Sequence, residues 1–373
     1  MEFSIHTFEL SYFCGCRDYI RLFEAVNKQN TARTSKTESY YHKQLGISIV
    51  SKCQTYTFLN KRGINRIRFY KLYNTDLGQI LQLKIKFVIN PKILLQSEEH
   101  PYTKIIEPKD LPLIPDALNS LIQQLVPGYP DILECGKLTR IDYCTNLWFQ
   151  SQEESDEYFH LLKKYFTPAK FHTDTYPNKE HHRKEPRKGE ISISCKSYTL
   201  SIYQKQTQLL STEYDYPPEE IENASGQLRI ELRFKRKKLY SIIRESHSLD
   251  KECDFLIHIP PSALSLAIKN LAVMYGTGDF FKFSAAKEQI LSSGYKDKTI
   301  DEMFHILENV NEKRTLDCYN TIFDSKPLKK HLKRFNCLGV SPITIPFRYS
   351  HDRYPNLIRY LTGESMDYLR VCL

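Results

Sequence analysis

A tyrosine and a lysine stand two residues apart in a segment that alternates polar and apolar side chains. The segment runs from Thr199 to Lys205 and reads TLSIYQK. Because successive side chains of a strand point to opposite faces, Tyr203 and Lys205 are predicted to share one face, with Tyr198 on the other. A tyrosine hydroxyl can attack phosphorus, and a nearby ammonium can stabilise the charge that develops on the phosphate. Tyr203 is therefore a candidate nucleophile, and Lys205 is its candidate helper.

The alternative interpretation of Tyr203 is a packing role. The chain contains 25 tyrosines, and a tyrosine on a strand usually packs against its neighbours. An unperturbed phenol has a pKa of about 10, so it needs a nearby cation or metal before it reacts. The strand pattern alone favours packing.

Acidic residues interrupt two strand-like segments, where such residues are depleted. Asp142 lies in the segment LTRIDYCTN, and Glu231 lies in QLRIELRFK. Carboxylates on neighbouring strands can hold a hard cation such as Mg²⁺ or Mn²⁺, which prefers oxygen ligands. Glu190, at the start of another strand-like segment, is a third candidate ligand.

The same acidic residues have a structural interpretation that the pattern supports about equally. Arginines alternate with them on the predicted polar strand faces, at Arg140, Arg229 and Arg233. Opposite charges on adjacent strands form cross-strand ion pairs. The sequence leaves open whether the carboxylates hold a metal or pair with these guanidinium groups.

Basic residues cluster in two places near the tyrosine. The segment TYPNKEHHRKEPRKGE is rich in turn-forming residues and predicts a loop or hairpin tip, either solvated or in contact with phosphates. A basic helix is predicted from about residue 236 to 245, after the strand of Glu231. The candidate phosphate-contacting residues are Arg183, Lys184, Arg187, Lys188, Arg229, Arg233, Lys235, Arg236 and Lys237.

The elements that position these residues predict an α+β fold, with an antiparallel sheet and flanking helices. Strand patterns cover residues 47–58, 64–72, 80–89 and 137–149, and short turns separate the first three. Residues 115–125 carry a helical apolar stripe, and Ser151 is a candidate N-cap for a second helix. After residue 260 the spacing becomes mainly helical. We therefore predict an α+β domain over residues 1–250 and a helical domain over residues 260–373, which is a further candidate for DNA binding.

The composition favours a polyanionic partner. The net charge is +9, from 53 Lys and Arg against 44 Asp and Glu, which suits nucleic acid or an anionic surface. The sequence contains no long apolar run or signal-like start, so we expect a cytoplasmic protein that does not enter the membrane. The ten cysteines lack C-x-x-C spacing and are expected to be reduced. No phosphate-loop, dinucleotide or serine-hydrolase motif is present.

Three blocks in order resemble a known family, the gene II/X replication initiators of filamentous phages and related plasmids. The blocks are KLTRIDYCTNLWF, TLSIYQKQTQL and ASGQLRIELRFKRKKL. The resemblance covers about residues 60–245. It implies that Tyr203 is the nicking tyrosine, that Asp142 and Glu231 help to hold a divalent metal, and that Lys205 assists at the phosphate.

A metal-dependent endonuclease and strand-transferase is the function that this resemblance implies. The protein would nick one strand of a double-stranded origin, form a 5′-phosphotyrosine and leave a 3′ hydroxyl as a primer. It would later rejoin the displaced single strand into a circle. Its expected partners are double- and single-stranded origin DNA together with host helicase and polymerase, in a bacterial cytoplasm. The alternative is a DNA-binding regulator that keeps the fold but does not nick.

Overall fold

The computed structural model describes most of the chain. The described residues are 3–29, 34–42, 44, 46–95, 102–165, 167, 171–178, 183–185, 189–211, 215–245, 254, 256, 261–313, 315–316 and 325–363. The fold is α+β, as predicted: a large antiparallel sheet with flanking helices. Ten strands are hydrogen-bonded in the order β2-β3-β4-β5-β1-β6-β12-β11-β10-β7.

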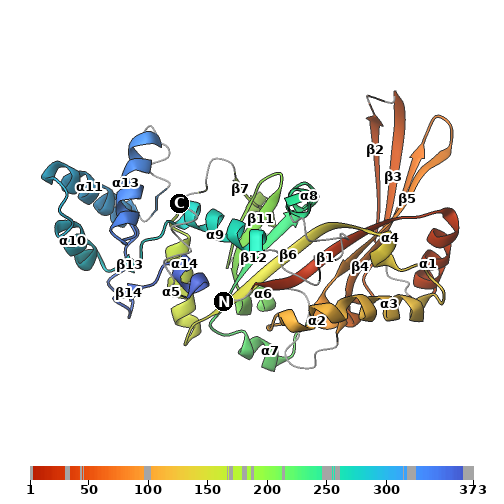
Figure 1. The fold of residues 1–373 in the computed structure, drawn as a ribbon, viewed down its shortest axis with the longest axis horizontal. Coiled ribbons are helices and arrows are strands. Elements are labelled where there is room, and N and C mark those ends of the chain that lie inside the picture. The colour runs from red at the N-terminus through yellow and green to blue at the C-terminus, as the bar shows by residue number, and fades with distance from the viewer. Residues whose placement is uncertain are drawn as a thin grey trace. The chain divides into compact units, whose positions relative to one another are not determined.

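The chain divides into two compact units (Figure 1). Unit 1 contains Met1–Glu2, Thr145–Glu231 and Pro261–Leu373, and unit 2 contains Phe3–Cys144 and Leu232–Pro260. The strands β6 (Lys137–Trp148) and β12 (Gln227–Lys235) contribute residues to both units.

Unit 2 combines long antiparallel strands with helices on one face. Its remaining elements are β1 (Ser4–Phe13), α1 (Cys16–Gln29), β2 (Thr34–His42), β3 (Ile47–Tyr56), η1 (Asn60–Arg62), β4 (Ile64–Asn74), β5 (Gln79–Ile89), α2 (Pro91–Leu94), η2 (Pro108–Leu113), α3 (Ile114–Leu125), α4 (Ile132–Cys135) and α8 (Arg236–Glu245).

Helices α1 and α3 cover the apolar face of the unit 2 sheet. Tyr19 and Phe23 of α1 contact the ring of Phe69 on β4, with ring centroids 5.5 and 5.2 Å apart. Phe69 alternates along β4 with polar residues on the opposite face, as strand geometry requires. The helices therefore bury the apolar side chains of β4 and leave a second, polar sheet face on the other side.

Unit 1 holds the shorter strands and most of the C-terminal helices. Its remaining elements are α5 (Gln152–Leu162), β7 (His172–Thr173), β8 (Tyr176–Asn178), β9 (Arg183–Glu185), β10 (Glu190–Ser194), β11 (Tyr198–Gln204), α6 (Lys205–Leu210), α7 (Pro218–Asn223), α9 (Pro261–Tyr275), β13 (Phe280–Phe281), α10 (Phe283–Leu291), α11 (Asp297–Lys313), α13 (Ser325–Cys337), β14 (Arg353–Tyr354) and α14 (Leu357–Thr362).

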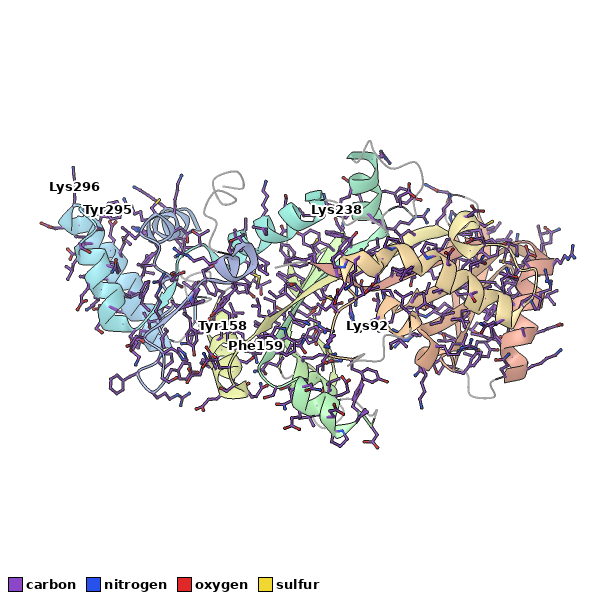
Figure 2. All side chains as sticks on the ribbon, turned by 60° about the horizontal axis from the view of Figure 1, so that its bottom comes forward. Lys92, Tyr158, Phe159, Lys238, Tyr295 and Lys296 are labelled. Carbon is purple, nitrogen blue, oxygen red and sulfur yellow. The ribbon has the colours of Figure 1, made fainter. Side chains whose placement is uncertain are left out.

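An aromatic cluster ties the middle of the chain to its C-terminal part within unit 1. Tyr158, labelled on α5 in Figure 2, has ring contacts with Phe280, Tyr354 and Tyr360 at centroid distances of 5.8, 5.7 and 5.4 Å. Its hydroxyl also donates to the Pro355 carbonyl. Unit 1 therefore joins residues from both predicted ranges, 1–250 and 260–373. The aromatic rings of α5 and of the C-terminal elements pack together in this unit.

Most predicted elements are confirmed by the structure. Strands β3, β4, β5 and β6 and helices α3, α5 and α8 lie within a few residues of their predicted ranges. Ser151 caps α5, since its hydroxyl accepts from the backbone N–H of Glu154 at 3.1 Å. The helices expected after residue 260 correspond to α9, α10, α11 and α13.

Two of the longer elements, β2 and α1, were not predicted. The polar stretch that contains β2 showed no period, because this edge strand is exposed along nearly its whole length and has no buried face to impose alternation. Helix α1 was also not predicted, although Tyr19, Leu22 and Val26 form its buried stripe.

No described helix is both long and apolar enough to span a bilayer. The described cysteines, which exclude Cys253, Cys318 and Cys372, are all free thiols.

Candidate active site

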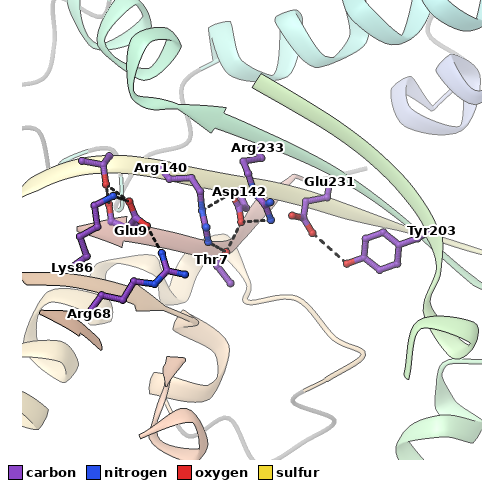
Figure 3. Close-up of polar contacts among 10 residues, drawn as sticks. Thr7, Glu9, Arg68, Lys86, Arg140, Asp142, Tyr203, Glu231 and Arg233 are labelled. Atoms are coloured by element: carbon purple, nitrogen blue, oxygen red, sulfur yellow. Dashed lines mark hydrogen bonds and ion pairs between the residues drawn. The ribbon is translucent and has the colours of Figure 1, made fainter. Parts of the chain in front are cut away.

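Tyr203 and Glu231 meet inside unit 1. The Tyr203 hydroxyl donates to Oε2 of Glu231 at 3.3 Å (Figure 3). Both side chains are nearly buried, with exposed fractions of 9% for Tyr203 and 7% for Glu231. The two residues come from strands β11 and β12, which are neighbours in the sheet. The structure thus brings together two of the residues that the sequence predicted to act on one phosphate.

A second carboxylate lies opposite the tyrosine on the other side of β11. Glu190 of β10 is the direct register partner of Tyr203 in the antiparallel pair. Directly opposed residues place their side chains on the same face, with Cβ atoms about 5 Å apart. Tyr203 is therefore flanked by two carboxylates, one from each adjacent strand.

Buried apolar residues lie on the opposite face of β11 and β12 and fix the register of these strands. Leu200 and Ile202 alternate with Tyr203 and are 2% and 0% exposed, while Leu228 and Ile230 of β12 are fully buried. Because a one-residue slip would expose this apolar set, the register of both strands is fixed. That register fixes the face on which Tyr203 and Glu231 lie.

Lys205 does not share the strand face of Tyr203, and this part of the prediction is wrong. Strand β11 ends at Gln204, and Lys205 is the first residue of helix α6. Its Nζ donates to Oε1 of Gln208 at 2.7 Å. The segment that follows Gln204 forms a helix that buries Leu209, so the two-residue period of the strand stops before Lys205.

Gly189 lies in the tight turn directly before β10. Its φ of 73° is in the left-handed region, and a Cβ at this position would lie 2.7 Å from Cγ2 of Thr207. Its carbonyl accepts from the backbone N–H of Gln204 at 3.0 Å. Only glycine fits this turn, which sets where β10 begins and where β11 ends.

Asp142 lies in unit 2 and is held by cations. Arg233 donates from Nε and Nη2 to the two carboxylate oxygens at 2.9 and 3.1 Å, and Nε of Arg140 lies 3.1 Å away. The Thr7 hydroxyl also donates to Oδ2 at 2.6 Å (Figure 3). The carboxylate side chain is 1% exposed. The ion-pair interpretation is therefore what the structure shows for Asp142.

The predicted three-carboxylate metal set is not assembled. Among the described residues, no group of three or more His, Cys, Asp or Glu side chains is placed to hold an ion. Both oxygens of Asp142 are occupied by donors, so Asp142 does not fit a metal-ligand role. Glu190 and Glu231 offer the oxygen chemistry that Mg²⁺ or Mn²⁺ prefers, and they flank the candidate nucleophile.

Arg229 is not a surface residue and is withdrawn from the candidate phosphate contacts. It is 1% exposed, and its Nε donates to Oδ1 of Asn146 at 2.8 Å. Arg233 is partly exposed, but its guanidinium pairs with Asp142. Arg236 and Lys237 are exposed at the start of α8. Lys235 is half-buried.

The predicted basic loop is only partly described. Arg183 and Lys184 form part of β9, which pairs with β8 as a short hairpin. Arg187 and Lys188 lie outside the described residues.

Sequence reasoning missed a buried acid on β1. Oε1 of Glu9 accepts from Lys86 at 2.8 Å and from Thr139 at 2.7 Å. Burial opposes its charge, but the hydrogen bonds from Lys86 and Thr139 and the charges of Lys86 and Arg140 outweigh burial and lower the pKa of Glu9. The segment TFELSYF carries the same signal as the Asp142 segment, an acid within an alternating strand.

A cavity of about 620 Å³ lies where β11 meets α6 in unit 1. Its walls come from one side of α5 and from α6. The lining residues are Gln152, Asp156, Phe159, His160, Lys163, Gly189, Gln204, Thr207, Leu210 and Ser211. Gln204, the neighbour of Tyr203 in the sequence, lines this cavity, whereas Tyr203 does not.

No family model and no curated protein sequence matches the chain. Among solved structures, the chain is similar to a rolling circle replication initiator protein from Geobacillus stearothermophilus, with 11% identity and a TM-score of 0.30, over 73% of this chain and 84% of that chain. It is also similar to the di-domain ARO/CYC BexL from the BE-7585A biosynthetic pathway, with 9% identity and a TM-score of 0.20, over 72% and 96%. Both scores are low, so neither likeness supports a function or a residue role, and the resemblance to gene II/X initiators stays a prediction.

Proposed function

We propose that this chain is a rolling-circle replication initiator, a site- and strand-specific DNA endonuclease and strand-transferase with Tyr203 as its nucleophile. One observation carries the proposal: the Tyr203 hydroxyl donates to Glu231 at 3.3 Å. The two residues belong to separate sequence motifs, each of which was predicted to serve the same reaction. A carboxylate at the hydroxyl can also accept the phenol proton, which the proposed reaction requires.

The geometry suits a carboxylate-assisted attack on phosphorus. As the Tyr203 oxygen forms its bond to the phosphorus, Glu231 accepts the phenol proton. The bond from phosphorus to the 3′ oxygen breaks, and that oxygen takes up a proton from solvent to leave as a hydroxyl. The product is a 5′-phosphotyrosine with a free 3′ hydroxyl. Rejoining runs the same steps in reverse, and the proton returns from Glu231 to the phenol.

The proposed reaction also uses a divalent cation beside the nucleophile. Glu190 and Glu231 flank Tyr203 and are the residues that would bind Mg²⁺ or Mn²⁺. Such an ion supplies Lewis-acid activation of the scissile phosphate when it is bound. Asp142 has no ligand role in this proposal, because its charge is already compensated by Arg140 and Arg233.

The proposed partners are double-stranded and single-stranded origin DNA. The net charge of +9 supports a polyanionic partner. Exposed Arg236 and Lys237 at the start of α8 are proposed to contact phosphates. Host helicase and polymerase, in a bacterial cytoplasm, complete the proposed cycle.

A DNA-binding regulator that does not nick is the second candidate. The observation that favours it is the 9% exposure of Tyr203, because a packing tyrosine is buried in the same way. The two candidates differ in whether Tyr203 ever becomes linked to DNA.

A covalent-capture experiment separates the two functions. The full chain is incubated with a single-stranded DNA library of random sequence and Mg²⁺ or Mn²⁺, then denatured in detergent. The proposal predicts a protein–DNA adduct that is lost in Tyr203→Phe and in chelator. Tyr198→Phe is the matched control, since its hydroxyl donates instead to Asn270 and should leave the adduct intact. An adduct from Tyr203→Phe, or none from wild type, would contradict the proposal.

A further inference from the structure

The open face of the unit 2 sheet carries a set of cations that the proposed nicking reaction does not use. Five basic residues, which we call the basic sheet face, alternate with buried apolar residues along three strands. They are Arg66 and Arg68 on β4, Lys84 and Lys86 on β5, and Arg140 on β6. Helix α1 packs on the opposite face, and the side chains of Arg68, Lys86 and Arg140 are 27%, 23% and 23% exposed on this one.

The register of the strands arranges these cations in rows with aromatic rings. Arg68 lies opposite Lys86, and Tyr70 lies opposite Lys84, in the β4–β5 pair. On the other side of β5, Lys84 lies opposite Phe13 of β1. Its Nζ is 4.6 Å from the Tyr70 ring centroid and 5.9 Å from that of Phe13. One row is therefore a cation between two aromatic rings.

Positive charge exceeds negative charge on this face. Glu9 pairs with Lys86 and lies 4.0 Å from Arg68, and Asp142 pairs with Arg140 (Figure 3). Arg66 and Lys84 take part in no ion pair among the described residues. The five cations therefore outnumber the carboxylates that face them.

The pKa values of Lys84 and Arg66 are lowered mainly by burial and further by neighbouring cations. Burial and the charge of Lys86 lower the pKa of Lys84, and Arg236 of α8 adds to the effect. Burial, with the charges of Arg68 and Arg140, lowers the pKa of Arg66. Glu9 acts in the opposite direction on Lys84 but does not cancel the effect. An anion on this face would relieve the repulsion.

We propose that the basic sheet face binds single-stranded DNA, with its cations on the phosphates and the rings of Tyr70 and Phe13 against unpaired bases. A positively charged surface with interleaved aromatic rings is the usual chemistry of single-strand binding. In a duplex the base faces are stacked on each other and cannot reach these rings. This inference rests on the proposed function for one point, the identity of the ligand, which is the displaced DNA strand.

The test removes two cations without disturbing the ion pairs of Glu9 and Asp142. The full-length Arg66→Gln/Lys84→Gln variant is titrated with fluorescent oligothymidine, and binding is followed by anisotropy at several salt concentrations. We expect affinity to fall about tenfold at physiological salt, and the salt slope to fall by about 1.4, because two single-strand phosphate contacts are lost. Circular dichroism checks that the variant is folded.

The matched control has the same change of charge elsewhere on unit 2. Lys28→Gln/Lys61→Gln removes two exposed lysines from α1 and η1, off the basic sheet face. We expect its affinity and salt slope to stay close to wild type. If the Arg66→Gln/Lys84→Gln variant does not fold, Arg66→Gln alone should weaken binding about fourfold and lower the slope by about 0.7.

The aromatic part of the proposal has its own pair of variants. Tyr70→Leu should weaken oligothymidine binding about fivefold, whereas Tyr70→Phe, which keeps the ring, should bind like wild type. Equal losses in the cation variant and its control would overturn the proposal. The proposal would also be overturned if the protein bound the matching duplex more tightly than oligothymidine. The same holds if the Arg66→Gln/Lys84→Gln change weakened binding to phosphatidylserine vesicles but not to oligothymidine.

The result can be separated from that of the nicking proposal. Binding of oligothymidine needs no divalent ion and no Tyr203 hydroxyl, so the surface can be confirmed when no covalent adduct forms. Conversely, an adduct that depends on Tyr203 with unchanged binding in the Arg66→Gln/Lys84→Gln variant would leave the nicking proposal standing and remove this one.

Discussion

Asp142 in unit 2 and Glu231 in unit 1 look alike in the sequence and differ in the structure. Each is a nearly buried carboxylate in the middle of a strand, at 0% and 7% exposure. Asp142 accepts hydrogen bonds from the Arg233 guanidinium and the Thr7 hydroxyl, and it forms an ion pair with Arg140. Glu231 accepts from the phenol of Tyr203. The role of an acid within a strand therefore depends on its hydrogen-bond and ion-pair partners.

The partners also determine what each carboxylate can do. Arg233 and Thr7 donate to the oxygens of Asp142 and Arg140 pairs with it, so Asp142 acts as a structural counter-ion. A phenol is a neutral donor that can give up its proton, so Glu231 can act as a base. Changes at Glu231 should therefore affect chemistry, and changes at Asp142 should affect folding.

The largest expected effect comes from removing the Tyr203 hydroxyl. Tyr203→Phe should reduce covalent adduct formation by about a thousandfold or more, since no other group replaces the nucleophile. The free energy of unfolding should change by only about 1 kcal/mol, the contribution of one hydrogen bond. Denaturant unfolding monitored in parallel distinguishes lost chemistry from lost folding.

Glu231→Gln should give the next largest effect. The amide keeps the shape of the side chain but cannot accept the phenol proton, so adduct formation should slow by about a hundredfold. A normal adduct rate would show that Glu231 is only a packing partner of Tyr203. The rate is measured by quenching samples over time and resolving the adduct on a denaturing gel.

Asp142→Asn should show the opposite pattern. Removing the buried charge leaves Arg140 and Arg233 facing each other, so the free energy of unfolding should fall by about 3 kcal/mol. Glu24→Gln, an exposed change on α1, is the control and should be nearly neutral. An adduct rate lost in folded Asp142→Asn, with unchanged stability, would reverse the roles assigned to the two carboxylates.

Glu9 predicts a pH dependence that is smaller than these effects. Its pKa is lower in the folded chain than the unfolded value of 4.5, so its contribution to stability is complete above that value. The contribution is lost as the pH falls from 4.5 through the folded pKa. Glu9→Gln should therefore be less stable than wild type near neutral pH, and the difference should shrink in acid. A pH-independent difference would contradict the assignment.

Tyr198→Phe should give the smallest effect. It removes the 2.7 Å hydrogen bond to Asn270 and should cost about 1 kcal/mol, with normal adduct formation. Burial raises the pKa of Tyr198 to about 12, so its neutral form adds stability that is lost as the pH rises from about 10 through 12. Difference absorbance against Tyr198→Phe checks this titration.

Alternation predicted the strands and faces of this molecule well where one face is buried. The neighbours of Asp142 and Glu231 in these strands, Ile141 and Ile230, are fully buried, because burial imposes the two-residue period. Alternation failed at the exposed strand β2, which has no buried face. It also failed at Lys205, where the chain turns into α6 one residue earlier than the pattern implied.

The sequence could not predict which residues meet across strands. The partners of Asp142 depend on the register between β1 and β6 and on the neighbouring β12, which are set by segments far apart in the chain. The basic sheet face had a visible signal in INRIRFYKL and LQLKIKFVI, since lysine and arginine alternate there with apolar residues. Only the register showed that these residues form rows with Tyr70 and Phe13.

Mapping the attachment site of DNA on the protein tests the central claim most directly. The captured adduct is digested with nuclease and protease, and the peptides are sequenced by mass spectrometry. The account predicts a nucleotide linked through its 5′ phosphate to Tyr203. Attachment to any other residue, or no linked peptide under conditions where the chain cleaves DNA, would contradict it.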